Sequence, residues 1–150
     1  YFLSNFKHFL GKLYKSEMCL FIMYYGKLLN KEFKEKICKD NEVLAVLLYG
    51  SYARGEENRD IDICIVLDKK YSNLSMSKKR VFYSSLLTSK YDVHIFQQLP
   101  LYIRPRVLKD GKVLVCKNED FLYELAFSTI KEFEMYKKIY YNYLGSMQNG

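Results

Sequence analysis

Blocks of hydrophobic residues, each with its own spacing, predict a small domain built from strands and helices. An unbroken apolar run over residues 43–49 predicts a strand that is covered on both faces. Residues 60–67 alternate isoleucines with other side chains, which predicts a second strand whose isoleucine face lies in a core. Residues 91–96 predict a third strand, and residues 113–115 predict a short final one.

Helical periodicity surrounds and separates these strands. Apolar residues at helical spacing predict a helix over residues 31–39, before the first strand, and another over residues 72–89, between the second and third. The same periodicity in residues 1–26 predicts a helical N-terminal extension. Residues 118–144 predict a long amphipathic C-terminal helix, and we expect a disordered tail over residues 145–150.

The predicted C-terminal helix carries more apolar surface than one small sheet needs for its cover. Its apolar stripe continues into the second half of the helix through Met135, Tyr136, Ile139, Tyr140 and Tyr143. This surplus has two interpretations, a surface for a partner protein or a surface on which the N-terminal helices pack. The sequence leaves both open.

Composition favours a single cytoplasmic domain without a membrane anchor. The 150 residues are enough for one core, and no apolar run approaches the roughly 18 residues of a membrane span. The four cysteines are scattered without the paired spacing of a zinc site, which predicts reduced thiols in the cytoplasm. His8 and His94 are isolated in the sequence, so we expect no histidine-based metal site.

The charge distribution changes the picture of the substrate. The net charge is +7, and residues 71–118 carry nine Lys and Arg against two Asp and Glu. A basic region beside an acidic strand favours an anionic substrate such as a nucleoside triphosphate, although an ordinary solvated surface can have the same composition. Nucleic acid is a weaker candidate partner, because net charge alone is poor evidence for it.

The start of the second predicted strand holds the candidate chemistry. Asp60 and Asp62 are two residues apart, so their side chains emerge on the same face of a strand. Two adjacent carboxylates repel each other unless a cation lies between them, and Mg²⁺ prefers such oxygen ligands. Gly50 and Ser51, which end the preceding strand, allow close backbone approach and hydroxyl contact to phosphate. The residues therefore predict a metal–nucleotide site; the alternative is a turn followed by two solvent-facing aspartates.

The chain resembles the minimal nucleotidyltransferases, a branch of the DNA polymerase beta superfamily, in three strings: Gly50-Ser51, Ala53-Arg54-Gly55-Glu56 and Asp60-Ile61-Asp62. The resemblance implies an α/β (α+β) fold of the polymerase beta-like nucleotidyltransferase type, with a small mixed sheet flanked by helices. It also implies that residues 27–117 form the catalytic core of a single domain. The helical N-terminal extension and the long C-terminal helix would be additions to that core.

The same resemblance assigns the metal ligands. Asp60 and Asp62 are expected to bind Mg²⁺, which bridges the triphosphate of a nucleotide, with ATP as the expected substrate. Superfamily members place a third carboxylate on the strand after the crossover helix, and Asp92 matches that position. Asp92 is therefore expected to bind a second Mg²⁺ and to help deprotonate the acceptor hydroxyl. An exposed aspartate on an edge strand is the competing interpretation of Asp92.

The phosphate contacts also follow from the resemblance. Gly50 and Ser51 are expected to contact the phosphates of the nucleotide. Arg54 is a further candidate for phosphate binding, although it could equally pair with Glu56 or Glu57.

The acceptor of the nucleotide is the last expectation. Small members of this family commonly act as antitoxins beside a helical HEPN ribonuclease, and the resemblance implies that they transfer AMP from ATP to a tyrosine of that toxin. One alternative is a catalytically weak antitoxin that acts by binding, which is favoured by the short loop between Ser51 and Asp60 and by Arg59 before the acids. Transfer to a small-molecule hydroxyl is a third reading, on which the sequence is silent.

Overall fold

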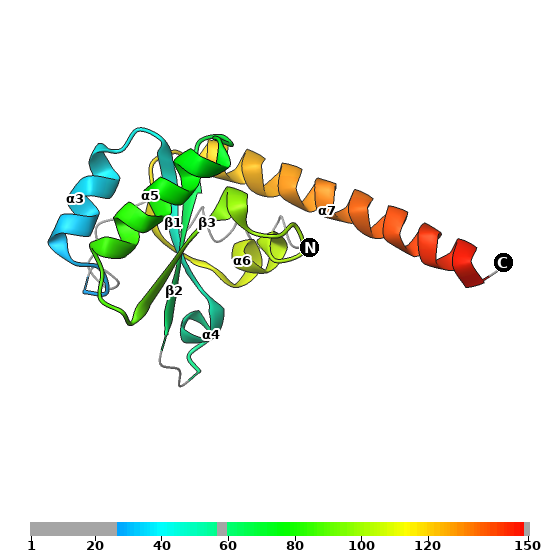
Figure 1. Ribbon diagram of the computed structural model, residues 1–150, viewed down its shortest axis with the longest axis horizontal. Coiled ribbons are helices and arrows are strands. Elements are labelled where there is room, and N and C mark those ends of the chain that lie inside the picture. Colours follow the sequence, from blue (N-terminus) through cyan, green and yellow to red (C-terminus); the bar gives the residue numbers. More distant parts are fainter. Residues whose placement is uncertain (1–26, 57–59, 149–150) are drawn as a thin grey trace.

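The computed structural model describes residues 27–56 and 60–148, which form one sheet with helices on both faces (Figure 1). The predicted N-terminal extension lies outside the described residues. The described strands are β1 Val43–Tyr49, β2 Ile61–Leu67, β3 Tyr91–Ile95 and β4 Lys112–Cys116. The helices are α3 Lys31–Lys39, α4 Gly50–Ala53, α5 Asn73–Ser85, α6 Arg104–Asp110 and α7 Glu119–Gln148, with a 3₁₀ turn η1 at Phe96–Gln98.

The sheet is mixed, with the strand order β3-β2-β1-β4. β1 pairs antiparallel with β2 and with β4, whereas β2 pairs parallel with β3. A parallel pair needs a crossover connection, which α5 supplies here between β2 and β3. The mixed sheet and flanking helices confirm the fold class expected from the sequence.

Each face of the sheet packs against its own core. On one face Ile61, Ile63 and Ile65 of β2 join a cluster with Phe33 of α3 and Met76 of α5. On the other face Cys64 and Val66 join a cluster formed with α6 and α7, to which these helices contribute Val107, Leu108, Leu122 and Ala126. Because side chains alternate along a strand, Asp62 shares its face with Cys64 and Val66. The candidate chemistry therefore lies on the face that carries α6 and α7.

β1 is one of the two central strands, and its side chains enter both cores. Its first six residues are buried, which confirms the prediction from the unbroken apolar run. The helix before it begins with an N-cap, where the Asn30 side chain accepts a 2.8 Å hydrogen bond from the Phe33 N–H. Asn30 also donates to the Leu86 carbonyl oxygen, so the same residue links the start of α3 to the end of α5.

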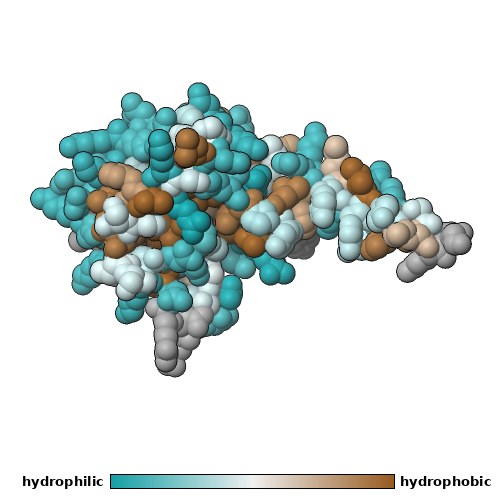
Figure 2. Space-filling model, viewed as in Figure 1, coloured by the Kyte–Doolittle hydropathy of each residue, from teal (hydrophilic) through white to brown (hydrophobic). Residues whose placement is uncertain are grey.

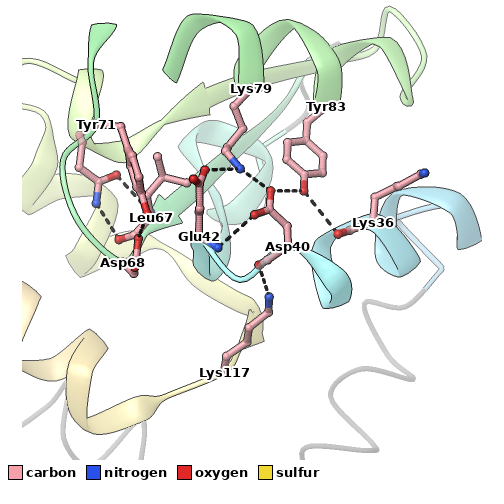
Figure 3. A network of polar contacts seen from close by, with 10 residues as sticks. Lys36, Asp40, Glu42, Leu67, Asp68, Tyr71, Lys79, Tyr83 and Lys117 are labelled. Carbon is pink, nitrogen blue, oxygen red and sulfur yellow. Dashed lines mark hydrogen bonds and ion pairs between the residues drawn. The ribbon is translucent and has the colours of Figure 1, made fainter. Parts of the chain in front are cut away.

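A polar network ties together the elements at the end of the sheet where β1 begins (Figure 3). Asp40 accepts hydrogen bonds from the Lys79 ammonium group and, at 2.8 Å, from the Tyr83 hydroxyl. Lys79 also pairs with Glu42 at 2.8 Å, and the ammonium group of Lys117 donates to the Asp40 backbone oxygen at 2.6 Å. The network thus joins the α3–β1 loop to α5 and to the end of β4.

Helix α7 extends well beyond the sheet (Figure 1). Leu122, Ala126 and Thr129 in its first half are buried, but the residues after Phe133 are exposed or only partly covered by the described part of the chain. The expectation of a disordered tail from Gly145 is wrong for its first four residues, because α7 continues to Gln148. One glycine inside a helix costs about 1 kcal/mol, which does not by itself end the helix. None of the described helices is long and apolar enough to cross a membrane.

The Asp40 network gives a prediction for stability. Burial alone would raise the pKa of Asp40, but its hydrogen bonds from Lys79, Tyr83 and the Glu42 N–H lower it below 3.8 overall. Replacing Lys79 with Met leaves a largely buried carboxylate without its cation. We expect Lys79→Met to lower the free energy of unfolding by about 2 kcal/mol at pH 7, measured by urea denaturation.

The neighbouring exposed lysine provides the control, and Lys78→Met should change the free energy of unfolding by less than about 0.5 kcal/mol. Because the pKa of Asp40 is lowered by folding, its contribution is present above pH 3.8 and is lost as the pH falls through its lowered pKa. The difference between Lys79→Met and the parent protein should therefore shrink in acid. An equal effect of both lysine variants, or a difference that grows below pH 3.8, would contradict the assignment.

Candidate active site

The parallel pairing of β2 with β3 brings two predicted acids together. Asp62 on β2 is in register with Asp92 on β3, and the next pair on the same face is Cys64 with His94. One ligand atom from each of Asp62, Asp92 and His94 lies within 4.8 Å of the other two. In the described part of the chain this is the one such group of three that could hold a metal ion.

The structure places His94 in a group that could hold a metal ion, whereas the isolated histidines of the sequence favoured no histidine-based site. The two histidines are isolated along the chain, but strand pairing places His94 opposite Cys64, in the pair next to Asp62 and Asp92 on the same face. Its position two residues after Asp92 on a predicted strand was the available signal, because such residues share a face.

Electrostatics at Asp62 favour a cation. Burial raises the pKa of the Asp62 carboxyl group, and the nearby carboxylates of Asp92 and Asp60 raise it further, while His94 and Arg54 act in the opposite direction. A carboxylate whose surroundings oppose its negative charge gains either from a proton or from a metal ion. The site is therefore suited to a divalent cation.

Gly50 is held against the same carboxylate. It begins α4 with a φ of +74°, a left-handed backbone conformation that L side chains rarely adopt. A Cβ atom at this position would lie 2.2 Å from Oδ2 of Asp62, closer than real Cβ contacts allow. Two constraints therefore require glycine at position 50: the left-handed backbone conformation and the close contact with the Asp62 side chain. Ser51 follows Gly50 in the same helical turn.

Asp92 has partners of its own. The His94 Nε2 lies 2.9 Å from Oδ2 of Asp92, and a guanidinium nitrogen of Arg80 lies 3.8 Å from Oδ1. Arg80 is oriented by a 2.8 Å hydrogen bond from its Nε to the backbone oxygen of Val93. Sequence reasoning missed Arg80, which projects from α5 toward β3. The imidazole of His94 packs edge-on against the ring of Tyr49, with 6.1 Å between the ring centroids.

Two predicted site residues lie outside this cluster. Asp60 immediately precedes β2, is exposed, and is not part of the group formed by Asp62, Asp92 and His94. Arg54 pairs with Glu56 in a 2.8 Å hydrogen bond on the exposed end of α4, the alternative that the sequence left open. The roles of Gly50, Ser51, Arg54, Asp60, Asp62 and Asp92 in catalysis, nucleotide binding and metal binding stay predictions.

A small mixed sheet with facing acids on neighbouring strands, beside a Gly-Ser turn, defines a nucleotidyltransferase of the polymerase beta type. The family model for the polymerase beta nucleotidyltransferases matches residues 31–120. The chain belongs to this family.

Individual relatives show the same likeness. A Methanocaldococcus jannaschii protein named as a putative protein adenylyltransferase is 41% identical over 76 residues, which are 49% of this chain and 57% of that relative. A chain in the crystal structure of a toxin–antitoxin with AMP-PNP aligns with a TM-score of 0.58 at 23% identity, over 80% of this chain and 99% of that chain. A chain in the complex of a tri-AMPylated Shewanella oneidensis HEPN toxin with its MNT antitoxin aligns with a TM-score of 0.52 at 20% identity, over 79% and 98% of the two chains.

The two glycines with positive φ give a matched test of the site. Gly50→Ala and Gly55→Ala each place a side chain in a left-handed conformation, φ +74° and +76°, which costs about 1–2 kcal/mol of stability. Gly50→Ala alone also forces the Asp62 carboxylate to move, since nothing lies within 4 Å of a Cβ at Gly55. We expect Gly50→Ala to weaken Mg²⁺-dependent binding of an ATP analogue at least about tenfold, and Gly55→Ala to leave it within about twofold.

Binding is measured by fluorescence titration and stability by urea denaturation for both variants. If the two substitutions weakened nucleotide binding equally, the close approach of Gly50 to Asp62 would have no role in the site.

Proposed function

We propose that this protein is a Mg²⁺-dependent adenylyltransferase that transfers AMP from ATP to a tyrosine hydroxyl of a HEPN-type toxin, and so acts as an antitoxin. The observation that carries the proposal is the facing pair of Asp62 and Asp92, with Gly50 packed directly against Asp62. We place the reaction in the cytoplasm, because the three cysteines of the described residues are free thiols.

Relatives support the nucleotide and the acceptor class. The Methanocaldococcus jannaschii relative is named for protein adenylyl transfer, and the aligned solved structures contain AMP-PNP in one case and an AMPylated HEPN toxin in another. A HEPN-type protein is therefore the first partner to test with this chain.

The donor chemistry of the site fits Mg²⁺. We assign Asp60, Asp62 and Asp92 as the residues that would hold it, since their carboxylates are hard oxygen ligands and the pKa of Asp62 is raised by burial and by the other two. Bound Mg²⁺ would neutralise charge on the triphosphate and on the leaving pyrophosphate. Gly50 and Ser51 would orient the phosphates, and Arg54 could reach them only by releasing Glu56.

Asp92 is placed to handle the proton of the acceptor. Its side chain is 51% exposed, so an incoming hydroxyl group can reach it. In the proposed reaction the acceptor oxygen bonds to the α-phosphorus, the bond from that phosphorus to the bridging oxygen of pyrophosphate breaks, and Asp92 accepts the hydroxyl proton. His94 and Arg80 hold the carboxylate in place for this step.

Helix α7 supplies the proposed contact with the toxin. Two rows of residues run along α7 in seven-residue steps. Leu122 and Thr129, which are buried, are followed by the exposed Tyr136 and Tyr143, and the buried Ala126 is followed by the partly covered Phe133 and by the exposed Tyr140 and Met147. Figure 2 shows hydrophobic side chains along the projecting part of this helix on the face in view. The stripe that packs against the domain thus continues outward as a surface suited to another protein.

The same stripe favours a second candidate function, in which the chain neutralises its partner by binding alone. The two candidates differ in their dependence on the acids of β2. An antitoxin that only binds would still inhibit the toxin after those acids are replaced.

Substitution of Asp62 separates the two functions. We expect Asp62→Asn to reduce transfer of label from α-³²P-ATP to a co-purified HEPN-type protein at least about 1,000-fold, because it removes a carboxylate on which the proposed metal site depends. Asp68→Asn is the matched control, because Asp68 follows the other end of β2, lies outside the site and accepts a hydrogen bond from the Tyr71 hydroxyl. This variant should leave labelling within about twofold of the parent protein.

Mass spectrometry of the labelled protein identifies the modified residue. Undiminished labelling in Asp62→Asn would refute the proposed active site. Absence of labelling in every variant, together with inhibition of the toxin by Asp62→Asn, would establish the binding function instead.

The α7 surface gives a separate prediction. Tyr136 and Tyr141 are the same residue type, 49% and 65% exposed, but they lie about 140° apart around the helix, and only Tyr136 continues the buried stripe. We expect Tyr136→Asp to weaken the complex with the HEPN-type protein at least about tenfold, whereas Tyr141→Asp changes it by less than about threefold. Calorimetric titration measures the affinity of both variants for the HEPN-type protein. Equal losses of affinity would mean that the apolar stripe of α7 is not the contact surface.

A further inference from the structure

We propose that His94 supplies an imidazole ligand when a first-row transition metal ion occupies the site, so that the side of the site next to Asp92 is built from two carboxylates and one imidazole. This inference rests on the proposed function, because it adds a ligand to the metal site of that reaction. The proposed function assigns three carboxylates, Asp60, Asp62 and Asp92, as metal ligands. The present inference adds an imidazole nitrogen to that set.

The first argument is the arrangement of the possible ligand atoms. Asp62, Asp92 and His94 bring one ligand atom each within 4.8 Å of the others, whereas Asp60 does not join a group of three under the same condition. Asp92 and His94 stand two residues apart on β3, where Asp92 is in register with Asp62 of the parallel neighbour β2 and His94 with Cys64. Regular strand pairing therefore positions these three side chains, while Asp60 lies one residue before β2.

The second argument is the position of the imidazole. His94 Nε2 lies 2.9 Å from Oδ2 of Asp92, so a nitrogen and an oxygen that can both bind a metal lie side by side. The ring is 24% exposed and packs edge-on against Tyr49, which limits its rotation and keeps it beside the acids. Arg80 still neutralises part of the charge on Asp92 from the other side.

The ligand set predicts which ions bind. Mg²⁺ takes oxygen ligands almost exclusively, whereas first-row transition metals accept imidazole nitrogen as well. The site should therefore gain affinity from His94 for Co²⁺ and Mn²⁺, but not for Mg²⁺. Selectivity among divalent ions, and not the presence of a site, is the property that His94 controls.

The test uses the full chain loaded with Mn²⁺ in the presence of a non-hydrolysable ATP analogue. Pulsed electron paramagnetic resonance detects a ¹⁴N nucleus bonded to Mn²⁺, and the chain has two histidines, His8 and His94, of which His8 is the control. We expect the nitrogen coupling in the parent protein and in His8→Gln, and its loss in His94→Gln. Gln can keep a donor near Asp92 but offers no imidazole nitrogen, so a residue that merely positions Asp92 would give no nitrogen coupling in any variant.

Metal titrations provide the second readout. We expect His94→Gln to weaken Co²⁺ binding at least about tenfold and to change Mg²⁺ binding by less than about twofold. Labelling the parent protein with ¹⁵N-histidine tests the ligand without any substitution, because the coupling must change to that of ¹⁵N. This measurement decides the question even if His94→Gln fails to fold.

The outcomes separate the inference from the proposed function. Binding of Mn²⁺ that is lost in Asp62→Asn but shows no histidine nitrogen coupling would overturn the role of His94 and leave the nucleotidyltransferase site standing. A failure of the parent protein to bind Mn²⁺ with the ATP analogue would overturn both. Equal losses of Co²⁺ and Mg²⁺ affinity in His94→Gln would show a positioning role and also overturn the inference.

Discussion

The parallel register of β2 with β3 is the constraint on which the site depends. It sets Asp62 against Asp92, two groups that repel each other and that lie thirty positions apart in the chain. This arrangement persists because each strand is anchored on its other face by a core, through Ile61, Ile63 and Ile65 on β2 and Val93 and Ile95 on β3. A shift by one residue would turn every one of these apolar side chains out of the core, so burial of the isoleucine face fixes the acids in place.

Much of this could be predicted from the sequence, because the information was local. The unbroken apolar run of β1, the helix at Lys31–Lys39 and the acids two residues apart at the start of β2 each depend on spacing within a few residues. The pairing of strands is not local. Residues 60–67 and 91–96 predict two strands, and the family resemblance grouped Asp92 with Asp62, but the fold was needed to show their register and that His94 joins them.

The end of α7 illustrates a different limit. Gly145 suggested a helix end, yet the helix continues to Gln148, because one glycine without a capping interaction does not stop a helix. The apolar stripe was visible in the sequence, but its division at about Phe133 into a covered and an uncovered part required the packing of α7 on the domain. Periodicity therefore shows that a helix has an apolar face, whereas the fold shows what is left to cover it.

Two aspartates at opposite ends of the sheet show how the fold separates stability from chemistry. Asp40 has Lys79 and Tyr83 as partners, and their hydrogen bonds outweigh burial and lower its pKa. Asp62 is similarly buried, but its neighbours include Asp92 and Asp60, and its pKa is raised. The protein thus provides the cation for Asp40 from its own side chains and leaves Asp62 short of one. A carboxylate in such surroundings gains from a cation that the protein's own side chains do not supply at Asp62 as they do at Asp40, and this difference separates the candidate site from the structural network.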